Sequence, residues 1–162
     1  MTIYRGVNGV KNTSKNNGDQ PFGINGGYLA CFAKDYLAVV TAVADTDKIS
    51  LGKVRDDAYL DADLSKITFD DMGTSITLDI GCDDVAMADW VSGSSTLLAD
   101  NIDVATAAGS SSILASVATA NKHKPLWQQL GLTSRPYKEI ELFATFAGNP
   151  GTGNVHWKII GS

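Results

Sequence analysis

The sequence predicts an all-β fold, an antiparallel β-sandwich or barrel that begins near residue 29. Three observations support this class. Apolar residues recur with a period of two in several short segments, turn-forming residues separate those segments, and no long amphipathic helices alternate with them. Seven or eight short strands are expected. The 162 residues fit one such domain, residues 29–162, preceded by an extended arm, residues 1–28.

The arm differs in composition from the rest of the chain. Residues 10–21 contain many Asn and Gly and almost no large apolar side chains. Such a segment cannot bury enough surface to offset the entropy lost on ordering, so we expect it to be extended. Isolated bulky residues along it suit docking onto another protein, although a terminus can also tuck them against its own domain. The candidate partner-binding residues of the arm are Tyr4, Phe22, Ile24 and Tyr28.

The first strands are expected in residues 36–43, 48–54 and 58–69, where β-branched and apolar residues alternate with polar ones. The alternation is clearest in residues 75–80, where Ile76, Leu78 and Ile80 share one face. The residues just before it, 71–74, are typical of a turn. A connection this short predicts that 58–69 and 75–80 form a hairpin.

The C-terminal residues repeat this pattern. Residues 139–146 and 154–159 alternate, and the glycine-rich segment 148–153 between them favours a turn. A second hairpin is therefore predicted. The inward-facing residues of its last strand are expected to be Val155, Trp157 and Ile159.

The middle of the chain is less regular. One helical turn is expected at residues 86–91, and a short helix at 124–131, with Pro125 near its start and Gly131 at its end. Residues 110–117 are small and moderately apolar, which favours a strand. The fold thus contains one or two short helices.

Composition and charge exclude several classes of function. The formal net charge is −5 and the basic residues are scattered singly along the sequence, which argues against a nucleic-acid partner. No apolar run is long enough to cross a bilayer, and the first residues lack the apolar core of a signal peptide. We therefore expect folding in a reducing cytoplasm, with Cys31 and Cys82 as structural or incidental thiols.

No catalytic constellation is visible in the sequence. His123 is expected to be solvated, and His156 to make an ordinary cross-strand contact with Glu139 or Glu141. Zinc motifs and a nucleophilic serine frame are absent, and 151–153 lacks a phosphate-binding lysine. Aspartate doublets occur where loops are expected, but without the spacing of a calcium loop. We therefore expect no enzymatic activity, no cofactor and no bound metal.

The segment from Ile67 to Gly81 carries a resemblance to a known family. It reads as a strand, an Asp-Asp-x-Gly-Thr-Ser turn and a Thr-Leu-Asp-Ile-Gly strand, and the chain closes with alternating strands between Tyr137 and Ile160. This order is similar to that of capsid cement or decoration proteins of tailed bacteriophages, in which turns written like "DDLGTS" and strands written like "TLDVG" precede a final glycine-turned hairpin. The resemblance covers roughly residues 48–160.

The resemblance implies a jelly-roll-like fold and a structural virion protein on the capsid surface. Its partners would be the major capsid protein and further copies of itself, in a homotrimer. The β domain would be the rigid body, and the arm would run across neighbouring capsid subunits. Trp90 and Trp127 are further candidates for partner binding, unless they belong to the core.

Two other classes of function stay open. A carbohydrate- or receptor-binding module of a phage head, neck or tail would expose Trp90 or Trp127 in a groove near acidic side chains. A small hydrolase would need two carboxylates at a glycosidase separation in one cleft.

Overall fold

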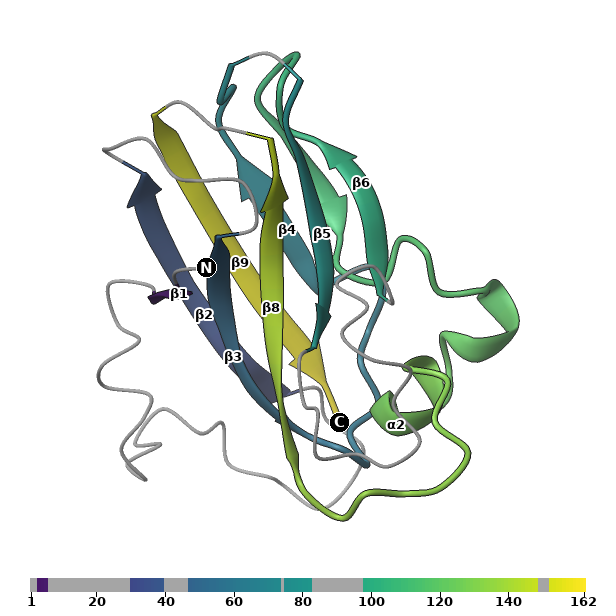
Figure 1. Cartoon of the computed structure of the whole chain (residues 1–162). Coiled ribbons are helices and arrows are strands. Elements are labelled where there is room, and N and C mark those ends of the chain that lie inside the picture. Colours follow the sequence, from purple (N-terminus) through teal and green to yellow (C-terminus); the bar gives the residue numbers. More distant parts are fainter. Residues whose placement is uncertain (1–2, 6–29, 40–46, 74, 83–97, 149–151) are drawn as a thin grey trace.

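A computed structural model describes residues 3–5, 30–39, 47–73, 75–82, 98–148 and 152–162 of the chain. These residues form two β-sheets packed face to face (Figure 1). The four-stranded sheet has the order β2-β9-β4-β7, and the five-stranded sheet has the order β1-β3-β8-β5-β6. The sequence-based prediction of an all-β sandwich is therefore confirmed.

The strands of the four-stranded sheet are β2 (Ala30–Val39), β9 (Gly153–Gly161), β4 (Lys66–Phe69) and β7 (Gly109–Ser112). Those of the five-stranded sheet are β1 (Ile3–Arg5), β3 (Lys48–Arg55), β8 (Glu139–Ala147), β5 (Thr77–Cys82) and β6 (Ala99–Asp103). Every neighbouring pair is antiparallel except β1 and β3.

Strands β2 to β9 are arranged as a jelly roll. The first of these eight strands pairs with the last, β3 pairs with β8, β4 with β7, and β5 with β6. This nested pairing is how a chain folded back on itself wraps into two sheets. As a result, consecutive strands fall in opposite sheets everywhere except at β5 and β6.

Both predicted hairpins are therefore wrong. β4 lies in the four-stranded sheet and β5 in the other, and β8 and β9 are likewise divided between the sheets. The short connections after β4 and β8 cross from one layer of the sandwich to the other instead of reversing within a sheet. A turn-rich segment between two alternating strands permits either path, because both paths bury one side of each strand.

The alternation itself was predicted correctly. Val155, Trp157 and Ile159 of β9 are buried between the sheets, and so are Leu78 and Ile80 of β5. A hydrogen bond joins the layers: the indole Nε1–H of Trp157 donates to the backbone carbonyl of Leu51 in β3 at 2.9 Å.

Other elements differ in extent from the prediction. Within residues 58–69 only β4 is a strand, and Leu60 makes a single bridge to Gly161. Within 110–117 the strand ends at Ser112, and turns follow it. Residues 40–43 of the first expected strand and the turn expected at 86–91 lie outside the described residues.

The short helix at 124–131 is confirmed as α2 (Leu126–Gln129). Pro125 is its N-cap, and Gly131 follows it with a φ of +76°. A single 3-10 turn, η1 (Thr119–Asn121), precedes it. None of the helices in the described part of the chain is long and apolar enough to cross a membrane. No disulfide joins Cys31 and Cys82.

Candidate functional site

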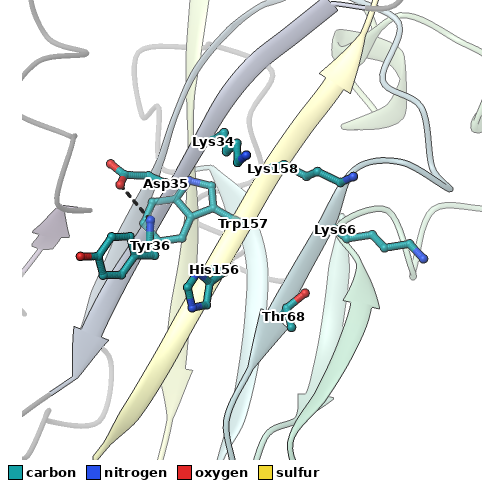
Figure 2. Close-up of a pocket in the computed structure, with 8 residues that line it drawn as sticks. All are labelled: Lys34, Asp35, Tyr36, Lys66, Thr68, His156, Trp157 and Lys158. Atoms are coloured by element: carbon teal, nitrogen blue, oxygen red, sulfur yellow. Dashed lines mark hydrogen bonds between the residues drawn. The ribbon is translucent and has the colours of Figure 1, made fainter.

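The outward side of the four-stranded sheet carries three lysines in register, which we call the lysine row. Lys34 of β2 lies opposite Lys158 of β9, and Lys158 lies opposite Lys66 of β4. Because residues directly opposite each other project to the same side of a sheet, the three side chains share one face (Figure 2). Lys34 and Lys66 are exposed, and Lys158 is half-buried.

A second row of side chains runs beside the lysine row, two residues further along each strand. It consists of Tyr36, His156 and Thr68, which are also in register. The rings of Tyr36 and His156 stack with centroids 5.4 Å apart and an interplanar angle of 22°. The two rows line a shallow hollow of about 450 Å³ on the sheet surface, together with Asp35 and Trp157 (Figure 2).

This face is positively charged, although the protein as a whole is acidic. The ion pairs found among the described residues join Arg55 to Asp57, and Arg135 to Asp56 and Asp57, so none of them involves the lysine row. Like charges directly opposite each other on neighbouring strands destabilise a sheet. The arrangement therefore favours an anionic group from outside the domain.

The carboxylate of Asp70 lies at the far end of this face, beyond the second row. Its Oδ2 accepts hydrogen bonds from the backbone N–H of Asn154 at 2.9 Å and from the Asn154 Nδ2 at 2.7 Å. Asn154 lies two residues before His156 in β9, and Asp70 lies two residues after Thr68, just past the end of β4. Asp70 is thus bonded to the sheet itself, and the lysine row keeps its positive charge.

The structure does not bring the residues predicted for partner binding together at this face. Tyr4 lies in β1, which runs parallel to β3 in the other sheet. Trp127 lies on α2, partly buried and packed against the core. The predicted sites at Phe22, Ile24, Tyr28 and Trp90 lie outside the described residues.

The predicted partners of His156 were wrong. Glu139 and Glu141 belong to β8 in the opposite sheet, where Glu141 accepts a hydrogen bond from the Ser50 hydroxyl at 2.6 Å. His156 instead stacks on Tyr36, because β9 pairs with β2. His123 is exposed, as expected, at the rim of a second hollow near Tyr59.

The lysine row itself was missed by the sequence reasoning. Its members are separated by 32 and 92 positions in the sequence, so they read as isolated charges. Each occupies a polar position of an alternating strand, which indicates the outward side. Only the order of the strands places them side by side, and that order follows from the jelly-roll topology.

The acidic doublet Asp56-Asp57 has a structural role. Asp56 is buried just after β3, and its carboxylate accepts hydrogen bonds from Arg135 Nε at 3.0 Å, Arg135 Nη2 at 3.1 Å and the backbone N–H of Tyr137 at 2.8 Å. Burial raises the pKa of Asp56, but the hydrogen bonds from Arg135 and Tyr137 outweigh it and hold the pKa below its ordinary value.

Asp79 shows the opposite shift. Burial raises the pKa of Asp79, and the neighbouring Asp100 carboxylate raises it further, although the N–H of Asn101 partly offsets both. Among the described residues, no group of three His, Cys, Asp or Glu side chains is arranged to hold a metal ion.

Comparison with known proteins shows which solved structures share this fold. No protein-family model matches the sequence, and no curated protein matches it. The structure resembles a chain in the capsid asymmetric unit of cyanophage Pam1, with a TM-score of 0.53 and 16% identity over 87% of this chain and 89% of that one. It also resembles a chain in the capsid of Ralstonia phage GP4, with a TM-score of 0.52 and 18% identity over 87% of this chain and 86% of that one. At these identities the likeness shows a shared fold, which is thus one found in phage capsids.

Proposed function

We propose that the protein is a structural virion protein that binds and stabilises the assembled capsid of a tailed phage, as a cement or decoration protein. The observation that carries this proposal is the jelly roll shared, over 87% of the chain, with chains of two phage capsid structures. The resemblance of residues 48–160 to cement proteins supports the same function from the sequence.

The proposed mechanism is stabilisation by mass action. A subunit that binds the assembled, expanded shell and not its precursor stabilises the expanded state by its binding free energy at every site. At a free concentration of 100 times Kd, this amounts to about 2.7 kcal/mol per site. The function requires no chemical step, and we propose that the protein is not an enzyme.

The proposed partners are the major capsid protein and two further copies of this chain, in a homotrimer on the capsid surface. The rigid sandwich would hold the lysine row in place, and the arm, residues 1–28, would add contacts through Tyr4, Phe22, Ile24 and Tyr28. Binding at many equivalent sites lets modest individual contacts stabilise a large shell.

The test is binding to isolated shells. Purified protein is mixed with expanded shells and with precursor shells of the phage that encodes it, and each mixture is sedimented. We expect the protein to pellet with expanded shells, at saturating stoichiometry, and to raise their melting temperature. A stable monomer that pellets with neither kind of shell would contradict the proposal.

A carbohydrate- or receptor-binding role is the second candidate. One observation favours it, the stacked Tyr36 and His156 in an open hollow, since exposed aromatic rings are suited to stacking on sugars. Of the two tryptophans expected to serve this function, Trp127 is partly buried against the core, and Trp90 lies outside the described residues. Binding to a glycan array that is lost in Tyr36→Ala would support this candidate.

A further inference from the structure

We propose that the lysine row is the docking site for a short acidic segment of a partner protein subunit, whose carboxylates pair with Lys34, Lys158 and Lys66. This inference rests on the proposed function, because it names the chemistry of the partner surface that the protein recognises. Three observations carry it: the register of the lysines, the charge of the whole chain, and the aromatic pair beside the row.

The register fixes the geometry of the positive charge. Neighbouring strands lie roughly 4.8 Å apart, so the Cα atoms of the three lysines span roughly 10 Å across β2, β9 and β4. In an extended partner segment, side chains on one side recur roughly every 6.7 Å. Two carboxylates at alternate positions of such a segment are therefore both within reach of the row, given the long lysine side chains.

An acidic partner segment relieves the electrostatic repulsion among the three lysines of the isolated domain. Three ammonium groups opposite one another repel, and none of the ion pairs found between described residues includes them, although the buried Asp35 also lines the hollow. A carboxylate placed between two lysines replaces this repulsion with two attractions. Docking thus gains free energy that a neutral face would not provide, and it selects against basic partner surfaces.

The charge of the whole chain distinguishes an acidic segment from a long polyanion. With a formal net charge of −5, the protein repels nucleic acid and anionic polysaccharide at long range, and three lysines are few for a polymer that must be held by many contacts. A short acidic segment can be bound by the local electric field of the row alone, because three lysines are enough to balance its few negative charges.

The second row supplies the apolar part of the contact. Tyr36 is 39% exposed and stacked on His156, so its ring is held in place before any partner binds. A rigid aromatic ring beside charged groups is the composition of strong protein–protein contacts, and aromatic side chains lose little entropy on binding. The hollow of about 450 Å³ accommodates the side chains of a short segment.

The experiment compares three variants with matched charge or matched position. In the first, Lys34, Lys66 and Lys158 are all replaced by Gln, which changes the net charge from −5 to −8 (three positive charges lost). In the second, the same lysines are replaced by Arg. In the third, the control, Lys53, Lys122 and Lys124 are replaced by Gln, giving the same net charge from positions outside the row. Circular dichroism verifies folding of each.

Affinity for expanded shells is measured by sedimentation at several salt concentrations. Since exposed ion pairs contribute modestly, we expect the first variant to bind about tenfold more weakly and with a smaller salt dependence. The Arg variant should bind within about threefold of wild type, and the control variant within about twofold. If the first variant binds as tightly as the control, the inference is wrong. If it binds shells normally but changes the sedimentation coefficient of the free protein, the row is a contact between copies of this chain, which also overturns the inference.

A second measurement separates this inference from the proposed function. Binding of a short glutamate-rich peptide, double-stranded DNA and dextran sulfate to the wild-type chain is followed by calorimetry. We expect the glutamate-rich peptide to bind, and its binding to be lost in the Lys→Gln row variant. Failure of the wild-type chain to bind shells, with binding of the peptide intact, would reject the proposed function alone. Preference for DNA or dextran sulfate, or no binding of the peptide, would reject the acidic-segment inference.

Discussion

Asp56 shows how a single residue connects distant parts of the chain. Its carboxylate follows β3 and receives three hydrogen bonds from Arg135 and Tyr137, which precede β8. Arg135 also contacts Asp57 at 2.7 Å, and its guanidinium lies over the Tyr137 ring at 4.9 Å. The buried carboxylate thus fixes the path of the connection into β8, with Tyr137 held at a φ of +55°.

The first prediction concerns Asp56→Asn. Removing the charge leaves the donors of Arg135 and Tyr137 with a weaker acceptor, so the free energy of unfolding at neutral pH should fall by about 2 kcal/mol. The measurement is urea denaturation. Asp57→Asn, at a more exposed position, is the control and should cost less than about 1 kcal/mol. Equal costs for the two variants would contradict this role of Asp56.

The second prediction is that the contact between Asp56 and Arg135 makes the stability of the fold depend on pH. The pKa of Asp56 is lowered in the folded state from 3.8, so the fold favours its ionised form. Its contribution is therefore fully present above pH 3.8 and is lost as the pH falls through the lower folded value. The stability difference between wild type and Asp56→Asn should be constant above about pH 5 and shrink below pH 3.8. A difference that stays constant to pH 2 would contradict the assignment.

Gly161 gives a third prediction at the residue scale. A Cβ at this position would collide with the backbone carbonyl of Tyr59, which accepts the N–H of Ser162 at 3.0 Å. Gly161→Ala must displace backbone, and we expect it to lower the free energy of unfolding by more than about 2 kcal/mol. Gly131→Ala, where nothing lies within 4 Å but φ is +76°, should cost about 1 kcal/mol. A thermal melt of both variants measures this, and a milder effect at Gly161 than at Gly131 would contradict it.

At the scale of elements, the bulge in β3 is matched to Trp157 of β9. Pairing with β8 shifts between Ser50 and Gly52, so Leu51 is the extra residue, and Gly52 adopts a φ of +120°. The bulge releases the carbonyl of Leu51, which accepts the Trp157 indole N–H. The two sheets are thereby joined by a buried hydrogen bond as well as by apolar packing.

The fourth prediction follows from this contact. Trp157→Phe leaves the Leu51 carbonyl buried without its donor and removes part of a buried ring, so unfolding should become easier by about 3 kcal/mol. Trp127→Phe, at a partly buried position on α2, should cost about 1 kcal/mol. Urea denaturation of both variants is the measurement. Similar costs would show that the indole hydrogen bond contributes little.

The strands were predicted from the sequence far better than their partners. The alternating residues in 75–80 and 154–159 identified buried sides correctly, because burial of one face imposes a period of two on a strand. In 139–146 the two glutamates mark the less buried side as expected, but residues 142–146 are all buried and do not alternate. The predicted hairpins failed because in a jelly roll the partner of β9 is β2, more than a hundred positions away. Periodicity specifies which side of a strand is buried and contains no information on which sheet it joins.

The candidate site could not be predicted from the sequence either, because periodicity does not specify the order of the strands. Lys34, Lys66 and Lys158 are ordinary outward-facing residues until the strand order is known. The predicted contact of His156 with Glu139 or Glu141 failed with the hairpin, since its neighbour is Tyr36 and not a glutamate of β8. Short-range features such as Pro125 and Gly131 around α2 were predictable because they act through local backbone geometry.

At the scale of the whole molecule, the two proposed contact regions make separable contributions. The arm, residues 1–28, precedes the jelly roll and carries Phe22, Ile24 and Tyr28. The fifth prediction is that replacing these three residues by Ser weakens binding to expanded shells at least about tenfold, because exposed aromatic and apolar anchors dominate such contacts. The melting temperature of the free protein should stay within a few degrees of wild type. Unchanged shell binding would show that the three replaced residues of the arm do not contribute to docking.

The most direct test of the central claim is a cryo-electron microscopy map of expanded shells to which the purified protein has been added. We predict ordered density for the jelly roll at symmetry-related positions on the outer surface, with the outward side of the β2-β9-β4 region against an acidic stretch of a shell subunit. Precursor shells treated in the same way should lack this density. Expanded shells that remain bare at saturating protein concentration would contradict the proposed function.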